Sequence, residues 1–105
     1  MAGVNNPYRY KYQTVAASQT GTVLIGKAGG GAVGDYLHRI VLTVNTAATA
    51  SLTILDGATS ISLQTGAATV IPGVYSMELN MVSASGAWSV TTGAGCTIVA
   101  VGIFT

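Results

Sequence analysis

The sequence contains very little charge. Charged residues make up 7% of the chain, four basic and three acidic, and the formal net charge is +1. A protein that binds nucleic acid by neutralising phosphates usually carries a surplus of basic residues. We therefore expect no nucleic-acid partner.

Cysteine and histidine are almost absent as well, since the chain has one of each. A single cysteine cannot form an intramolecular disulfide or a cysteine-rich zinc site. A single histidine cannot form the histidine cluster of a metal site. We expect neither a bound metal nor a cofactor.

Long hydrophobic runs are missing too. The longest apolar stretch, Cys96–Phe104, has about half the length of a membrane-spanning helix. The amino end, MAGVNNPYRYKY, lacks the apolar core of a secretory signal. We therefore expect no membrane partner and synthesis in the cytoplasm. With 105 residues the chain has room for one domain, which we place at 13–105, after an extended N-terminal arm at 1–12.

What the chain does contain is apolar or small. Half of its residues are hydrophobic, its mean hydropathy is +0.56, and Ala, Gly, Ser and Thr supply 51 residues. A small domain exposes most of its residues, so weakly polar side chains must lie outside. Either small residues cover the surface, as in rigid extracellular or virion β-proteins, or much of it is buried against identical copies or a larger assembly. We expect both.

Apolar residues recur with a period of two almost throughout, which indicates β-strands. Asp56-Gly57, Pro72-Gly73 and Ser85-Gly86 mark turns between them. Regular short strands separated by turns are typical of a sandwich or jelly roll. The sequence predicts an all-β, jelly-roll-like antiparallel β-sandwich of about eight short strands, at 13–17, 22–25, 36–44, 51–55, 60–64, 75–81, 88–91 and 96–104.

The last predicted strand is apolar on both faces. Ile98, Ala100 and Phe104 alternate with a second apolar set, Val99, Val101 and Ile103. One face packs on the core, and the other needs a cover of its own. We therefore predict a homo-oligomer with Val99, Val101 and Ile103 at the subunit interface.

One glycine-rich segment matches a nucleotide-binding pattern literally. Gly29–Gly34 fits G-x-G-x-x-G, but the dinucleotide motif requires a helix after the glycines. Here YLHRIVLTV follows, which is rich in β-branched residues and predicts a strand. The segment is therefore interpreted as a loop.

No catalytic group stands out. His38 shares its parity with Ile40 and Leu42, and we interpret it as a histidine at a sheet edge with a satisfied ring nitrogen. Cys96 begins an apolar strand and is expected to be an inert buried thiol. The three carboxylates are far apart in the sequence: Asp35 ends the glycine loop, Asp56 has a turn role, and Glu78 is on an outward face. We expect no enzyme activity.

The most distinctive local sequence is Tyr8-Arg9-Tyr10-Lys11-Tyr12, in which aromatic and basic residues alternate. In an extended conformation its tyrosines share one face and its cations the other. Such an arm suits stacking on single-stranded bases, or docking on its own sheet or on a neighbour. Since the rest of the chain carries so little positive charge, we favour docking.

Trp88 is expected to be a core anchor rather than a platform for sugars.

Several segments together resemble a known group of proteins. A tyrosine-bearing arm and a Gly-rich loop precede DYLHRIVLTVNT, the ILDG turn, GVYSMELNM and a strand that runs to the last residue. This pattern resembles the small β-sandwich virion proteins of tailed bacteriophages, particularly capsid decoration (cement) proteins and short head fibres. The resemblance implies a jelly-roll-like trimer on the outer surface of the head that bridges neighbouring major capsid subunits, without catalytic residues.

The sequence is also compatible with two other functions. The alternative is a fibre knob or lectin-like module that binds a host surface glycan, in which case Trp88 or the arm tyrosines should be exposed in a groove beside a polar group. An enzyme ranks last.

Overall fold

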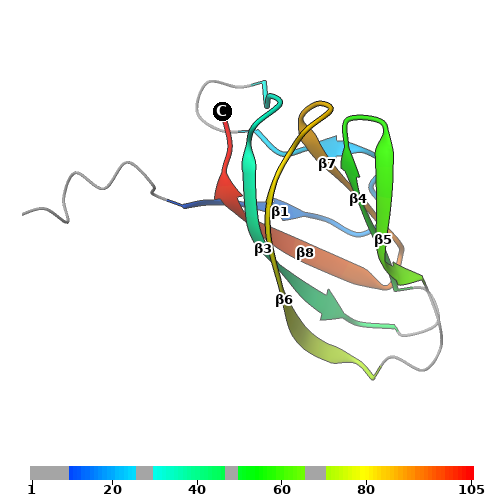
Figure 1. The fold of residues 1–105 in the computed structure, drawn as a ribbon. Helices are drawn as coiled ribbons and strands as arrows, with labels where there is room; N and C mark the ends of the chain where they lie inside the picture. The colour runs from blue at the N-terminus through cyan, green and yellow to red at the C-terminus, as the bar shows by residue number, and fades with distance from the viewer. Residues whose placement is uncertain (1–9, 26–29, 47–49, 66–70) are drawn as a thin grey trace, which may run out of the picture.

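The computed structural model describes residues 10–25, 30–46, 50–65 and 71–105. The described chain is all-β (Figure 1). Its eight strands are β1 (Lys11–Val15), β2 (Thr22–Val23), β3 (Tyr36–Val44), β4 (Ser51–Asp56), β5 (Thr59–Thr65), β6 (Gly73–Val82), β7 (Trp88–Thr92) and β8 (Cys96–Ile103). Each overlaps a predicted strand, so the predicted fold class is confirmed. β1 begins at Lys11, so the last two residues of the predicted arm, Lys11 and Tyr12, belong to the sheet.

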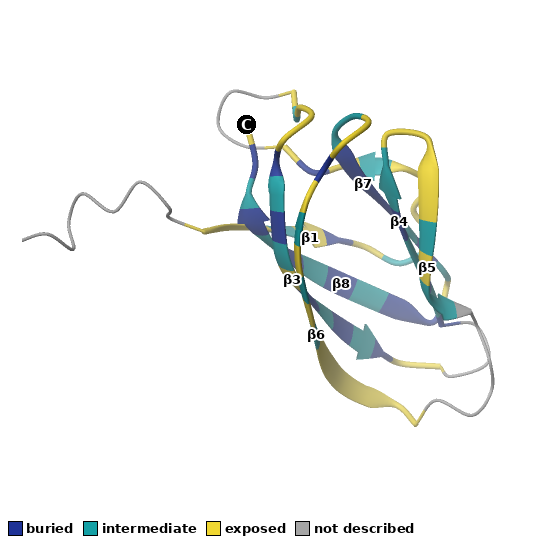
Figure 2. Cartoon of the chain, in the orientation of Figure 1, coloured by how far each residue is buried: buried dark blue, intermediate teal, exposed yellow. Residues whose placement is uncertain are grey.

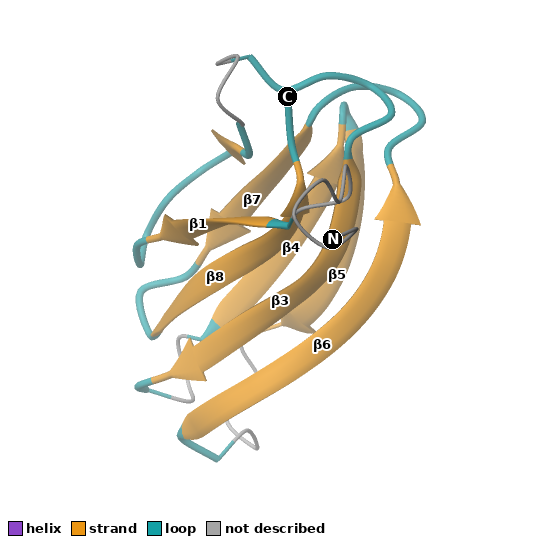
Figure 3. Ribbon diagram, turned by 90° about the vertical axis from the view of Figure 1, so that its left-hand side faces the viewer, coloured by secondary structure: helices purple, strands orange, loops and turns teal. Residues whose placement is uncertain are grey.

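The eight strands form two antiparallel sheets of four, packed as a sandwich. The strand orders are β1-β8-β3-β6 and β2-β7-β4-β5. The first strand therefore pairs with the last, β2 with β7, β3 with β6 and β4 with β5. These nested pairs describe one long hairpin rolled into two sheets, which is the jelly-roll arrangement. Figure 3 shows β6 at one margin of its sheet and β1 at the other.

The core lies between the two sheets and is made by the inward residues that the alternation predicts. In β8 the residues alternate strictly between buried and half-buried. Leu52, Ile54 and Val90 of the facing sheet are fully buried, and Figure 2 shows buried residues along β8, β3 and β7. Trp88 is 1% exposed, which confirms it as a core anchor, and its indole N–H donates to the Asp35 carbonyl oxygen at 2.9 Å.

The face of the sheet predicted for His38 is wrong. His38 does not share a face with Ile40 and Leu42, because the register shifts between Leu37 and Arg39 on both sides of β3. Two residues of β3, Leu37 and His38, lie opposite the single residue Gly102 of β8, which is the arrangement of a β-bulge. Leu37 is therefore the buried residue, and His38 is half-buried on the other face. Nor is His38 at a sheet edge, since β3 lies between β8 and β6.

The loops agree with the turn signals. Residues 30–34 of the glycine segment form a loop that leads directly into β3. Gly57, with a φ of 60°, lies between β4 and β5. Asp56 has the expected turn role, although it holds a different turn: its carboxylate accepts hydrogen bonds from the backbone N–H groups of residues 84–86. Over the described ranges, no helix has the length and apolar character needed to cross a membrane.

Candidate functional site

The outer face of the sheet β1-β8-β3-β6 has an apolar centre on β8, and the polar residues Thr14, Thr43, Ser76 and Thr97 lie around it. Val99, Val101 and Ile103 alternate with the buried residues of β8 and are half-buried, so they face away from the core, as predicted. Val41 of β3 lies opposite Val99, and Tyr12 of β1 lies opposite Val101. These side chains form a continuous surface across three strands, which we call the outer face.

The outer face has one pair of charges. Arg39 and Glu78 are directly opposite each other on β3 and β6. Both residues are exposed. Opposite charges at facing positions of neighbouring strands stabilise the pairing modestly, and they leave the face without net charge. A partner surface therefore meets an apolar centre, polar side chains around it and no excess of charge from this pair.

The arm begins beside this face. Of its five predicted contact residues, Tyr8 and Arg9 lie outside the described residues. Lys11 and Tyr12 belong to β1, which pairs with β8. Tyr12 is 76% exposed and Tyr10 is 50% exposed, the former being among the most exposed large hydrophobic residues described. Two tyrosines of the arm are therefore available for contact at the margin of the outer face.

Tyr10 is held in place by an aromatic cluster at the β-bulge. Its ring stacks on the His38 ring with a centroid distance of 4.5 Å and an interplanar angle of 11°. It also lies 6.1 Å from the ring of Tyr36. A ring that is stacked in advance loses less conformational freedom when it binds a partner. The root of the arm is therefore a pre-ordered contact.

Asn80 organises the other members of the cluster. Its side-chain oxygen accepts a hydrogen bond from the Tyr36 hydroxyl at 2.7 Å and lies 3.0 Å from Nδ1 of His38. This arrangement assigns the proton to Nδ1, because an amide oxygen only accepts. Asn80 has a φ of 51°, a left-handed conformation that asparagine tolerates better than most residues. It occupies the extra position of β6 at the register shift.

Burial raises the pKa of the Tyr36 phenol above its usual value of 10.0, with a smaller contribution from Tyr10. The neutral hydroxyl is thus the form that the cluster favours. As a neutral donor it is suited to the hydrogen bond with Asn80. Through this hydrogen bond the cluster joins β3 to β6.

An open cavity of about 560 Å³ adjoins the cluster. It is lined by Tyr10, Gly34, Asp35, Tyr36, Val82, Ile103 and Thr105. The Asp35 carboxylate is buried and already accepts hydrogen bonds from the Ala32 N–H and from the N–H and hydroxyl of Thr105. It is therefore committed to holding the chain. What the cavity offers to a ligand is mainly apolar and aromatic surface.

The residues considered for catalysis are not brought together. Cys96 lies opposite Val44 at the far end of β3, six residues beyond His38, which corresponds to roughly 20 Å along a strand. Cys96 is fully buried in the core, whereas His38 is on the outer side. Among the described residues, no group of three or more His, Cys, Asp and Glu is arranged to hold a metal ion.

Sequence reasoning did not identify this cluster. Nothing in the spacing of Tyr36, His38 and Asn80 along the chain indicates that their side chains meet. An asparagine inside a strand is a weak signal for a bulge, because asparagine accepts the left-handed backbone that a bulge can require.

Neither the models of protein families nor the curated proteins include a match to this chain.

Proposed function

We propose that the chain is a structural protein of a bacteriophage virion. It acts as a capsid decoration protein that binds the outer surface of the head as a homotrimer and bridges neighbouring major capsid subunits. The protein works by contact and catalyses no reaction. The bacteriophage setting and the trimer come from the resemblance of the sequence, and the surfaces described above supply the contacts.

The observation that carries this proposal is the apolar outer face with the aromatic cluster at its margin. Val99, Val101 and Ile103 present partly exposed apolar side chains in the middle of a sheet. Contiguous apolar surface of this kind is typical of interaction sites. The arm supplies a second contact, since Tyr10 is pre-ordered by His38 and Tyr12 is exposed. Aromatic residues are enriched in the cores of protein interfaces.

The low charge of the chain also suits dense packing on a particle. Adjacent copies with a formal net charge of +1 repel each other weakly. A decoration protein stabilises a capsid because it binds the assembled lattice and not the separated subunits. Many identical contacts then act together, so each one can be weak.

A second candidate function is recognition of a host surface glycan. The observation that favours it is the cavity beside Tyr10 and Tyr36, where exposed aromatic surface adjoins polar groups. Trp88 contributes nothing to such a site, because it is buried. The Asp35 carboxylate already accepts hydrogen bonds from Ala32 and Thr105, so it is not free to bind sugar hydroxyls in the cavity. Capsid decoration is therefore the better supported function.

The proposal is tested by co-sedimentation of the purified chain with virion heads that lack it, made from the genome that encodes it. The native chain is expected to sediment with heads and to raise their thermal stability, but not to bind separated capsid subunits. Tyr12→Ser should weaken the binding about tenfold, since an exposed aromatic contact is lost without disturbing the core.

The matched control is Ser60→Asp, which changes an exposed residue of β5 on the opposite sheet. It should bind heads as the native chain does. Absence of binding by the native chain, together with hits on a glycan array that Tyr10→Ala abolishes, would reject capsid decoration in favour of glycan recognition.

A further inference from the structure

One end of the sheet β1-β8-β3-β6 carries a row of apolar and aromatic residues. Tyr36, the first residue of β3, is opposite Ile103 of β8 and Val82 of β6. Tyr10 directly precedes β1, which pairs with this end of β8. The same four residues line the open cavity described above. All four strands of the sheet therefore contribute to its walls, at or beside their ends.

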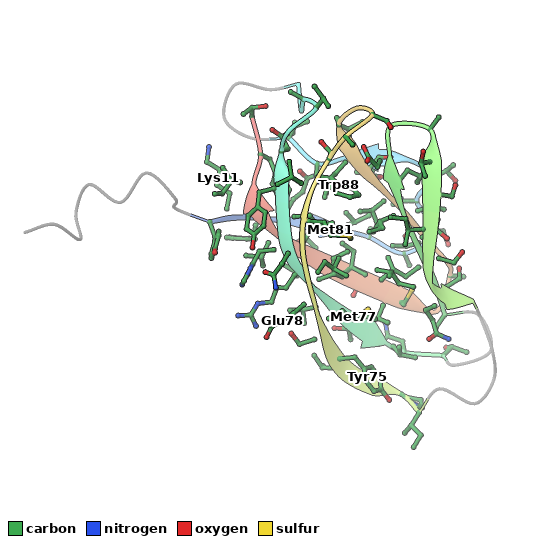
Figure 4. All side chains as sticks on the ribbon, in the orientation of Figure 1. Lys11, Tyr75, Met77, Glu78, Met81 and Trp88 are labelled. Atoms are coloured by element: carbon green, nitrogen blue, oxygen red, sulfur yellow. The ribbon has the colours of Figure 1, made fainter. Side chains whose placement is uncertain are left out.

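The lining also includes a buried carboxylate without a counter-charge. Asp35 directly precedes β3 and is 4% exposed. Its oxygens accept hydrogen bonds only from neutral groups, the N–H of Ala32 and the N–H and hydroxyl of Thr105. Lys11 lies at this end of the sheet (Figure 4), but neither it nor another basic residue of the described ranges forms an ion pair with Asp35. Buried charges in proteins are usually paired, so a bound cation would complete this site.

Two aromatic rings line the same cavity. The centroids of Tyr10 and Tyr36 are 6.1 Å apart, and the ring planes are tilted by 35°. The face of an aromatic ring attracts a cation that lies within about 6 Å of its centroid. Tyr10 is held by its stacking on His38, yet it is 50% exposed and keeps accessible ring surface. The rings and the carboxylate therefore favour a ligand of the same sign, a positively charged one.

The hydrogen-bond acceptors of the cavity determine which kind of cation fits. A carboxylate accepts about four hydrogen bonds, and three donors already occupy Asp35. A primary ammonium brings three donors and a guanidinium five, so Asp35 could satisfy only one of them. A quaternary ammonium brings methyl groups and no donor. Its methyl groups suit the apolar side chains of Val82 and Ile103, which line the cavity.

We propose that this cavity binds a quaternary ammonium group, of the kind that choline and betaine carry. The rings of Tyr10 and Tyr36 contact the cation, and Asp35 supplies the compensating charge without a direct hydrogen bond. This inference does not rest on capsid decoration, because no subunit or capsid contact enters it. It adds a small-molecule site to a chain for which we otherwise propose protein contacts alone.

The test is a titration of the native chain with choline, followed by NMR of its backbone amides and by calorimetry. Choline is expected to bind and to shift the amides of residues 34–36 and 103–105. Dimethylbutanol, in which carbon replaces the ammonium nitrogen of choline, should bind at least about tenfold more weakly because it has no charge. Ethanolamine should also bind at least about tenfold more weakly, since its ammonium donors lack acceptors. No binding of choline, or equal affinity for choline and either analogue, would overturn the proposal.

Variants of one tyrosine test the aromatic contact. Tyr10→Leu should weaken choline binding about tenfold, whereas Tyr10→Phe keeps the ring face and should stay within about threefold of the native affinity. The matched control is Tyr12→Leu, which removes an exposed tyrosine that does not line the cavity. It should bind choline as the native chain does. Equal losses in Tyr10→Leu and Tyr12→Leu would place the ligand elsewhere and overturn the site.

Asp35→Asn tests the charge. The variant should weaken the binding of choline and leave that of dimethylbutanol unchanged, and circular dichroism establishes that it is folded. An unchanged affinity for choline in the folded variant would overturn the role of the carboxylate. Phosphatidylcholine vesicles distinguish the two sources of the ligand. Co-sedimentation with them would identify a lipid headgroup, and binding of free choline alone would identify a soluble compound; both results support the site.

Discussion

At the scale of single residues, two side chains hold the backbone where it leaves regular strand geometry. Asp56 at the end of β4 accepts hydrogen bonds from the N–H groups of Ala84, Ser85 and Gly86. Asn80 takes the left-handed conformation at the β-bulge and joins Tyr36 to His38. The sequence predicts a turn role for Asp56 from Asp-Gly, but which turn it holds depends on two loops that meet only in the fold.

The hydrogen bonds from Ser85 and Ala84 hold the pKa of Asp56 below its usual value of 3.8. A carboxyl with a lowered pKa stabilises the fold above its unfolded-state pKa, and this stabilisation is lost as the pH falls through its folded-state pKa. Asp56→Asn should therefore lower the melting temperature at neutral pH, and the difference from the native chain should shrink near pH 2. Thermal melts by circular dichroism measure both. An equal difference at both pH values would show that ionisation of Asp56 is irrelevant.

Asn80 allows the backbone and the side-chain contributions to be separated. Asn80→Ala should cost about 1–2 kcal/mol, because alanine is strained in the left-handed region. Asn80→Gly loses the same amide but accepts the conformation, so it should cost less. Denaturant unfolding measures both. Equal losses in the two variants would mean that the hydrogen bonds to Tyr36 and His38, and not the backbone conformation, determine the cost.

At the scale of the elements, the strands are predictable because alternation and turn residues are local signals. β3 begins at Tyr36 and ends at Val44, as the sequence predicts. The facing of His38 was not predictable, because the register shift depends on β8 and β6 together. Assigning alternate residues to opposite faces of a sheet assumes an uninterrupted strand, and a bulge breaks that assumption. The aromatic cluster is not predictable either, for a second reason. Tyr10 meets His38 only because β1 pairs with β8 and β8 pairs with β3.

Gly102 shows how closely two neighbouring elements pack. A Cβ atom at this position would overlap the carbonyl oxygen of Tyr36 and lie 2.9 Å from Cζ of Phe104. Gly102→Ala should therefore destabilise the fold by about 3 kcal/mol, because the backbone of β3 cannot move aside cheaply. Gly30→Ala is the control, since no atom of the described residues lies within 4 Å of a Cβ placed there. Urea unfolding should leave this control within about 0.5 kcal/mol of the native chain. Equal stability of the two variants would contradict the close approach.

At the scale of the whole molecule, the composition predicts a surface that is more apolar than is usual for a small domain. Part of this surface lies on the outer face, which the sequence predicts, and part lies elsewhere on exposed residues that include Val23, Ile25, Val33 and Ile71. Val99, Val101 and Ile103 stand out because one strand is apolar on both faces. The partial exposure of Met77 and Leu79 cannot be predicted from the sequence, since both alternate like ordinary core residues. Their partial exposure follows from the position of β6 at the margin of its sheet.

The central claim, decoration of a capsid, is tested most directly by electron microscopy of intact virions. The virions are made from the genome that encodes this chain and labelled with antibody raised against it. The account predicts regular labelling over the whole head. Labelling confined to the tail or to fibre tips, or no labelling of the particle, would contradict it.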